Sequence, residues 1–236
     1  MERKTPATTS PHEGAPAEPD GHPAASAAHI LQVLRRRIVQ GDIAPGVPLV
    51  EMSLAAEFAT SRAKIREVLA MLDERGLVER RPNRGAVVRR ATLGELRHLF
   101  EVREALEGMA ARLAAQNAAP GSWRKLVELF GAPTEALVEA GDATGYVARH
   151  ERLRTRILEE ARNPVLTATL APLYDRTAAV MRRLVLVTNR PREALAEHRA
   201  VLAALAARDP DAAEACKRAQ LRSARLALEH YSAFVL

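Results

Sequence analysis

Three cations lie close together in the sequence at Arg62, Lys64 and Arg66, directly after Ser61. Apolar residues recur around them at helical spacing, so we expect these cations in the first turns of a helix capped by Ser61 or Thr60. Cations are locally unfavourable there, because the N-terminal end of a helix carries positive dipole. The cluster therefore indicates an anionic partner, and Arg is the preferred side chain for guanine in the DNA major groove. A solvated basic helix end is the alternative interpretation.

The residues on both sides of this helix predict a helix-turn-helix followed by a β-hairpin. Gly76 can end the helix in a left-handed conformation, and two short β-prone runs follow it. The turn between these runs contains Asn83, Arg84 and Gly85, which we predict to lie against DNA phosphate or to enter a minor groove. The expected apolar face of the two helices consists of Leu54, Ala55, Phe58, Ile65, Val68, Leu69 and Leu72.

A further helix is predicted from 28 to 40, where Gly41 stops it. Three consecutive arginines lie on its polar faces, and we assign Arg35 among them as a contact to the DNA backbone. A solvated charged face is the alternative for this run. The apolar stripe of this helix is expected at Ile30, Leu31, Leu34 and Ile38.

Three more polar side chains, Arg103, His150 and His198, fall where helical periodicity predicts the interior of a later domain. A buried guanidinium is costly unless it is paired. Glu107, one helical turn beyond Arg103, could provide that pairing; otherwise Arg103 is available for bidentate binding to the carboxylate of a ligand. The two histidines, taken alone, are more often hydrogen-bonded core residues than ligands.

The overall composition favours a helical protein with an anionic partner. The chain has 236 residues, of which 47% are hydrophobic and only 3% aromatic, with a net charge of +6 and a pI near 10.1. Residues 28–90 contain twelve Lys and Arg and seven Asp and Glu, so a net charge of +5 lies in about a quarter of the chain. A basic segment of this kind suits a polyanion such as DNA.

Several signals bear on the location of the protein. No apolar run reaches about 18 residues, so no transmembrane helix is expected. The N-terminus lacks the apolar core of a secretion signal. Cys216 is the single cysteine, so no disulfide can form within the chain. We therefore expect a cytoplasmic protein that does not contact a membrane.

These patterns predict a mostly α protein with three regions. Residues 1–27 are rich in Pro, Ala, Thr and Ser and are expected to form a disordered tail. Residues 28–90 should form a winged helix-turn-helix with a small β-wing, and residues 91–236 an all-α antiparallel bundle. The six or seven helices expected in the bundle span 93–116, 122–130, 134–140, 142–162, 164–188, 191–208 and 210–234. Thr92 and Glu95 form a capping box before the first of them, whose apolar stripe is predicted at Leu96, Leu99, Phe100, Val102, Leu106, Met109, Ala110 and Leu113.

The N-terminal pattern resembles the winged helix-turn-helix of the GntR family of transcription regulators. The pieces that carry this resemblance are GDIAPG at 41–46, LVE at 49–51, LA at 54–55, SR at 61–62, IREVL at 65–69, Leu72, RGLV at 75–78 and NRGAVV at 83–88. The C-terminal half resembles the effector domain of the FadR-type branch of this family, the FCD domain. Its matching pieces are FEVREALE at 100–107, NPVL at 163–166, EHRAVLAAL at 197–205 and RDPDAA at 208–213.

The resemblance implies a homodimer whose two winged domains read the half-sites of a near-palindromic operator in double-stranded DNA. It also implies that the FCD-like bundle, residues 91–236, provides dimerisation and binds a small-molecule effector such as an organic acid. We expect a repressor, although the sequence leaves the sign of regulation, the operator and the identity of the effector open.

Many FCD domains hold a divalent metal with an acidic residue and three histidines, and the resemblance maps that site onto this chain. His150 and His198 match two of the histidines, but Gln220 stands at the position of the third and Tyr146 at that of the acidic residue. Two imidazoles and an amide are a poor ligand set for zinc. We therefore expect that metal binding, to zinc or nickel, is weakened or lost, and that Arg103, Tyr146, His150, His198 and Gln220 bind the effector directly. No other cofactor is expected.

Two other functions remain as alternatives. A nucleoid-type protein would bind DNA without responding to an effector. A metal-dependent or acid–base enzyme would need a catalytic motif, and the sequence has no P-loop, HExxH or nucleophile–base signature. We therefore expect no enzymatic activity.

Overall fold

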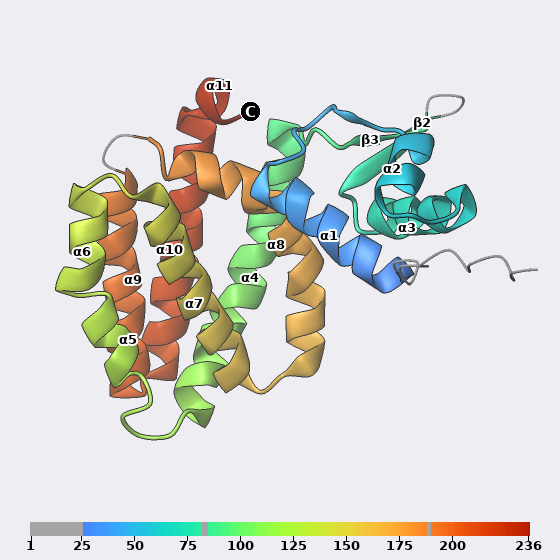
Figure 1. Ribbon diagram of the computed structural model, residues 1–236. Coiled ribbons are helices and arrows are strands. Elements are labelled where there is room, and N and C mark those ends of the chain that lie inside the picture. The colour runs from blue at the N-terminus through green and yellow to red at the C-terminus, as the bar shows by residue number, and fades with distance from the viewer. Residues whose placement is uncertain (1–25, 82–84, 188–189) are drawn as a thin grey trace, which may run out of the picture.

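The computed structural model describes residues 26–81, 85–187 and 190–236. Its N-terminal part is a winged helix-turn-helix that combines three helices with a three-stranded sheet (Figure 1). The helices are α1 (Ala27–Gln40), α2 (Glu51–Glu57) and α3 (Arg62–Glu74), and the strands are β1 (Pro48–Leu49), β2 (Val78–Arg81) and β3 (Gly85–Val88). The predicted order of helix, turn, helix and wing is confirmed. Residues 1–25 of the predicted tail, and the predicted DNA contacts Asn83 and Arg84, lie outside the described residues.

Local capping sets the ends of these helices. Ser61, and not Thr60, is the N-cap of α3, because its side-chain oxygen accepts a hydrogen bond from the backbone nitrogen of Lys64 at 3.2 Å. Gly41 follows α1 with φ at 84°, and Gly76 follows α3 with φ at 69°. Both are left-handed conformations that glycine adopts readily. The stop signals predicted at these two glycines are therefore confirmed.

The wing is an antiparallel sheet with the strand order β1-β3-β2. Val78 pairs with Val88, and Arg81 pairs with Gly85 at the other end of β2. One apolar core joins the sheet to the three helices. Its buried members are Ile30, Leu34, Ile38, Leu49, Leu54, Ile65, Val68, Leu69, Leu72, Leu77, Val78, Ala86 and Val88. The predicted apolar residues Leu31, Ala55 and Phe58 pack against this core but are only partly buried.

The C-terminal part is a bundle of α-helices, as predicted. The helices are α4 (Leu93–Asn117), α5 (Arg124–Leu129), α6 (Ala132–Glu139), α7 (Ala143–Ala161), α8 (Pro164–Leu184), α9 (Arg190–Ala207), α10 (Pro210–His230) and α11 (Ser232–Val235). The described residues contain one short helix more than expected, because the last predicted helix ends at His230 and α11 follows separately. The capping box of Thr92 and Glu95 is present. None of the helices in these ranges is long and apolar enough to span a membrane.

The apolar stripe predicted for α4 is partly wrong. Leu96, Leu99 and Phe100 are buried as expected, but Val102 and Met109 are 49% and 44% exposed. Further along the helix, which contacts α7 and α10, the buried residues are small: Ala110, Ala111, Ala114 and Ala115. Alanine permits close approach of neighbouring helices, but its weak hydrophobicity does not mark the buried face in the sequence. The prediction relied on the larger apolar residues, and it therefore placed part of the buried face of α4 wrongly.

Helix α8 is the element through which the bundle meets the winged domain. It lies against α1, as Figure 1 shows. Asp175 of α8 accepts hydrogen bonds from Arg35 of α1, with Nε–Oδ2 at 2.5 Å and Nη2–Oδ1 at 2.6 Å. The neighbouring residue Arg176 lies against Gly76, such that a Cβ added to this glycine would be 3.2 Å from the Cδ of Arg176.

Candidate functional site

The N-terminal end of α3 presents two exposed arginines. The side chains of Arg62 and Arg66 are 61% and 52% exposed, and both face Glu51 at the start of α2. Arg66 Nε lies 2.8 Å from Glu51 Oε2, and Arg62 Nη2 lies 3.5 Å from the same oxygen. The hydrogen bond from Arg66 is the main cause that lowers the pKa of Glu51. One carboxylate thus orients two guanidinium groups and leaves a net positive charge at the end of the helix.

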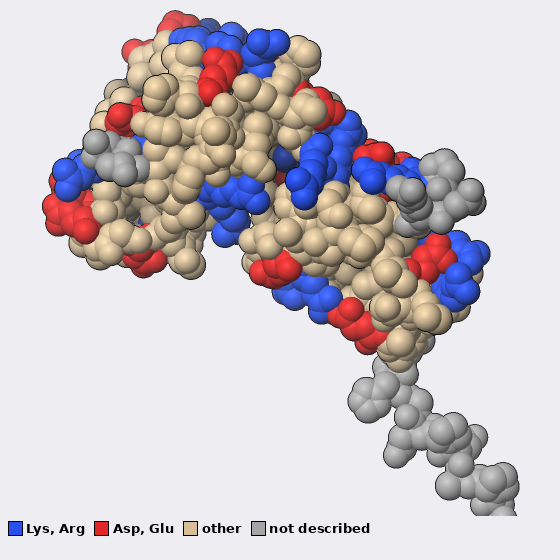
Figure 2. All heavy atoms as spheres, turned by 90° about the horizontal axis from the view of Figure 1, so that it is seen from above, with Lys and Arg blue, Asp and Glu red and all other residues tan. Residues whose placement is uncertain are grey.

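The other predicted DNA contacts in the described residues lie in three different places: α3, β3 and α1. Lys64 is partly buried in the same first turn, and Gly85 is an exposed residue with φ at 73° at the start of β3. Arg35 lies apart from this group, in its ion pair with Asp175. In the space-filling view the winged domain and the bundle form two lobes, and basic and acidic side chains are interspersed on the face shown (Figure 2). The structure therefore gathers Ser61, Arg62, Lys64 and Arg66 at one helix end and places Arg35 elsewhere.

A cavity of about 80 Å³ lies inside the bundle, and all five residues predicted to bind an effector line it. Helices α4, α7, α8, α9 and α10 provide its walls, and Val39 of α1 reaches it from the winged domain. The predicted residues in its lining are Arg103, Tyr146, His150, His198 and Gln220. Further polar residues that line it are Glu107, Glu151, Arg154, Tyr174, Thr177, Arg182, Arg190 and Lys217.

Arg103 is buried and paired. Its Nε lies 2.9 Å from Oε1 of Glu107, and its Nη2 lies 2.8 Å from the same atom. Its Nη1 donates a hydrogen bond of 2.8 Å to the hydroxyl of Thr177. The pairing with Glu107 that the sequence allowed is therefore present, and Arg103 remains part of the cavity wall at the same time.

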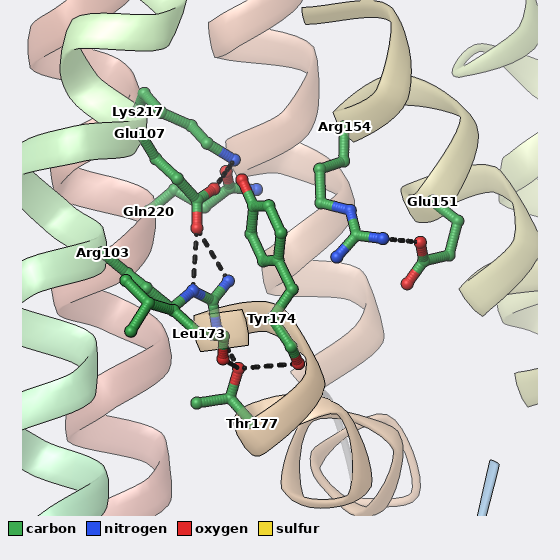
Figure 3. A network of polar contacts seen from close by, with 9 residues as sticks. All are labelled: Arg103, Glu107, Glu151, Arg154, Leu173, Tyr174, Thr177, Lys217 and Gln220. Atoms are coloured by element: carbon green, nitrogen blue, oxygen red, sulfur yellow. Dashed lines mark hydrogen bonds and ion pairs between the residues drawn. The ribbon is translucent and has the colours of Figure 1, made fainter. Parts of the chain in front are cut away.

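Lys217 shares the carboxylate of Glu107 with Arg103. Its Nζ lies 2.9 Å from Glu107 Oε2 and donates a hydrogen bond of 2.9 Å to Gln220 Oε1. Figure 3 shows Glu107 between the two cations, with the ring of Tyr174 beside them. Burial alone would raise the pKa of Glu107, but the charges of Lys217 and Arg103 and their hydrogen bonds outweigh it and lower this pKa to about 2. The carboxylate is therefore ionised and holds two buried cations in place.

The two histidines and Tyr146 form a second polar group in the cavity. The Tyr146 hydroxyl lies 3.2 Å from Nδ1 of His198, and the rings of His150 and His198 have centroids 5.1 Å apart. Burial lowers the pKa of both histidines well below the usual value, and the charge of Lys217 lowers it further. Burial and the nearby positive charge thus disfavour the protonated form of both imidazoles. Nε2 of His198 is buried and has no hydrogen-bond partner among the described residues.

Two further cations of the cavity wall, Arg190 and Arg154, pair with carboxylates other than Glu107. Arg190 makes two hydrogen bonds to Glu197, at 2.9 and 3.0 Å, and Arg154 pairs with Glu151. Tyr174 packs between two guanidinium groups, 4.1 Å from that of Arg154 and 5.0 Å from that of Arg103 as measured to the ring centroid. These contacts fix Arg154, Arg190 and Tyr174 in the wall, which His198, Gln220 and Lys217 also line.

Tyr146, His150, His198 and Gln220, which the resemblance placed at a metal site, are not a suitable ligand set for a divalent metal. Among the described residues, no group of three or more His, Cys, Asp or Glu is arranged to hold such an ion. The oxygen of Gln220 is bound to Lys217, whose positive charge lies in the same cavity as His150 and His198. A metal there would meet a fixed cation in place of an anionic ligand.

Sequence reasoning missed Lys217, although one signal could have identified it. It precedes Gln220 by three positions, and residues at this spacing share a face of a helix. The buried face of α10 comprises Ala213, Lys217, Gln220, Leu221, Ala224 and Leu228. A lysine on an apolar stripe beside a predicted effector residue indicates a buried cation.

Comparison with known proteins agrees with this architecture. Residues 26–88 match the family described as bacterial regulatory proteins, gntR family, and residues 98–223 match the FCD domain. The chain is 32% identical over 192 residues to a probable D-xylose utilization operon transcriptional repressor of Paenarthrobacter nicotinovorans, covering 80% of this chain and 82% of that protein. It is 31% identical over 209 residues to the galactonate operon transcriptional repressor of Escherichia coli, covering 78% and 89%. The solved structure of E. coli McbR/YncC shares the fold, with a TM-score of 0.72 and 23% identity over 87% of this chain and 98% of that one.

These matches define the class of protein. The chain belongs to the GntR family of bacterial regulatory proteins and carries an FCD domain behind its winged helix-turn-helix. It is a DNA-binding transcription regulator and not an enzyme.

Proposed function

We propose that this chain is a homodimeric transcriptional repressor that acts in the cytoplasm and releases its operator when a small organic acid enters the bundle cavity. The observation that carries this proposal is the position of helix α8. Its residues Tyr174 and Thr177 line the cavity, while Asp175 binds Arg35 of the winged domain. Two of the similar proteins named above are described as operon repressors, one of them as a probable repressor, which supports the sign of regulation.

Recognition of DNA is assigned to the N-terminal end of α3. Arg62 and Arg66 are exposed and already oriented by Glu51, so they present guanidinium groups without a large rearrangement. Exposed ion pairs of this kind contribute only about 0–1 kcal/mol, so exchanging Glu51 for phosphate or a guanine edge is not strongly opposed. Two copies of α3 in a dimer would read two half-sites of a near-palindromic operator.

Effector control requires that the acid binds the two arrangements of the protein unequally. The wall of the cavity and the contact with the winged domain share consecutive residues, from Tyr174 to Thr177. Occupation of the cavity that shifts this stretch of α8 would move Asp175 against Arg35 and Arg176 against Gly76. The orientation of α3 would then change, and with it the spacing of the two DNA-reading helices.

The proposal is tested with the promoter fragment beside the protein's own gene. Fluorescence anisotropy should show binding to this fragment well above that to a scrambled duplex of equal length, at the same salt concentration. Small organic acids that raise the melting temperature of the protein should weaken this binding. Equal affinity for both duplexes, together with no acid that alters melting, would instead support a nucleoid-type protein.

A further inference from the structure

We infer that the ammonium group of Lys217 is a built-in cation that binds the carboxylate of the effector directly, so that this FCD domain recognises a small hydroxy acid without a divalent metal. This inference rests on the proposed function, since it assigns the anchoring residue and the ligand class of the same cavity.

The buried charges of the inner cluster do not cancel. Arg103 and Lys217 are 2% and 4% exposed, and both bind the single carboxylate of Glu107. The pairs of Arg154 with Glu151 and of Arg190 with Glu197 are already balanced. The inner cluster of Arg103, Lys217 and Glu107 therefore carries one positive charge in excess, and Arg182 adds a further cation to the cavity wall. A surplus buried charge is unfavourable unless an opposite charge joins it, so the cluster favours an anionic ligand.

The hydrogen-bonding capacity of Lys217 leaves room for that ligand. An ammonium group has three donors and no acceptor. Two of the three are used by Glu107 and Gln220 in the described part of the chain, each at 2.9 Å. The third is available to a ligand carboxylate within the cavity that Lys217 lines. Glu107 and Gln220 hold Nζ in place, so the side chain loses little freedom when it binds an acid.

The same cavity also provides a nitrogen that can bind a ligand hydroxyl. Nε2 of His198 is buried without a partner, and the imidazole is positioned by the Tyr146 hydroxyl at Nδ1. A ligand hydroxyl can satisfy this nitrogen, whichever tautomer is present, because a hydroxyl both donates and accepts. A cavity of about 80 Å³ has room for about six water-sized groups. A short acid with one carboxylate and at least one hydroxyl matches these features.

The same lysine explains why the cavity does not suit a metal. A divalent ion bound to His150 and His198 would lie in the cavity that also contains the Lys217 ammonium, and Gln220 already gives its oxygen to that ammonium. Restoring a carboxylate at position 146 and an imidazole at position 220 should therefore not be sufficient for tight zinc binding. The fixed cation must also be removed before zinc can bind tightly.

The first test measures zinc binding by isothermal titration calorimetry. The wild-type chain should bind Zn²⁺ only weakly, and Y146D/Q220H should remain weak although it regains a carboxylate and a third imidazole. Adding Lys217→Met to that pair should tighten zinc binding by about tenfold or more. Melting curves check that each variant is folded, and Lys125→Met, which removes an exposed lysine of α5, is the matched control. One zinc ion bound tightly per wild-type chain, or equal affinities in the double and triple variants, would overturn the inference.

The second test measures acid binding in the presence of EDTA. Glycerate, lactate, malate and tartrate are compared with glycerol, which has hydroxyls but no carboxylate. At least one acid should raise the melting temperature of the wild-type and Lys125→Met proteins, and Lys217→Met should bind that acid about tenfold or more weakly. No stabilisation by any of the acids, stabilisation that appears only in a parallel measurement without EDTA, or an unchanged response in Lys217→Met would each count against Lys217. Promoter binding by the acid-free wild-type chain is measured separately, and its loss alone would count against the proposed function.

Discussion

Asp175 in the bundle accepts two hydrogen bonds from Arg35 in the winged domain, at 2.5 and 2.6 Å. The side chain of Asp175 is 5% exposed and that of Arg35 is 40% exposed, so the buried carboxylate depends on this partner. The pair joins two residues that are 140 positions apart in the chain. It connects α8, which lines the cavity of the bundle, to α1, the first helix of the DNA-binding domain.

Replacing Arg35 with Ala should destabilise the protein and weaken effector control. An unpaired buried carboxylate costs on the order of 1–3 kcal/mol, which urea denaturation would detect. The effect of a stabilising acid on promoter affinity should fall several-fold, because the ion pair between α8 and α1 is lost. Arg36→Ala, the exposed neighbour, is the control and should change neither quantity. If Arg35 instead contacts DNA phosphate, as the sequence suggested, its removal would lower the salt dependence of DNA binding by about one unit of slope.

Replacing Arg62 or Arg66 with Ala should weaken promoter binding by about 1–3 kcal/mol where the side chain reads a base. The free energy of unfolding should change little, because both side chains are exposed and pair only with Glu51. Anisotropy titrations at several salt concentrations would separate a base contact from a phosphate contact. Lys125→Ala is the control for lost positive charge. Unchanged affinity and unchanged salt slope in both arginine variants would remove α3 from the DNA interface.

The Glu107 carboxylate should make the protein sensitive to acid. Its pKa is about 2 in the folded protein against an ordinary value of 4.5. Because the folded pKa is depressed, its stabilising contribution is fully present above pH 4.5 and is lost as the pH falls toward 2. Denaturation curves measured across this range should show that the free energy of unfolding depends less on pH in Glu107→Gln than in the wild type. This variant should also be less stable at neutral pH, because Arg103 and Lys217 lose their shared anion. The exposed Glu139→Gln should retain the wild-type pH dependence.

Gly76 should tolerate alanine less well than Gly41, although both have positive φ, at 69° and 84°. Each substitution should cost about 1–2 kcal/mol of stability, because alanine disfavours the left-handed conformation. At Gly76 the new Cβ would also lie 3.2 Å from Arg176 of α8, whereas at Gly41 it meets nothing within 4 Å. The difference between the two losses of stability reports the contact between α8 and the winged domain. Equal losses would mean that Arg176 moves aside freely.

The fold was largely predictable because its determinants are local. The cap at Ser61, the glycines after α1 and α3 and the stripe of α3 each act within a few residues. The prediction failed for Val102 and Met109 of α4, where alanines form the contact with neighbouring helices and large apolar side chains remain exposed. Hydrophobicity alone does not reveal a helix face that is buried because its side chains are small.

The candidate effector site was predictable in part for a related reason. Arg103, His150 and His198 each stand out as polar groups on an apolar stripe, and the structure places all three in one cavity. Lys217 has the same signature on α10 but is one of 35 Lys and Arg residues, so its place beside Glu107 was not evident. The binding roles of these residues stay predictions until the experiments above are done.

The order of helices and strands, and the buried stripes of α1 and α3, follow from the sequence alone, because capping and periodicity operate over one or two turns. For charges on helices far apart in the chain, the partner depends on how those helices pack. Glu107 of α4 holds Lys217 of α10, and Asp175 of α8 holds Arg35 of α1. A cation has many candidate carboxylates along an unfolded chain, and the packing of helices distant in sequence selects one of them.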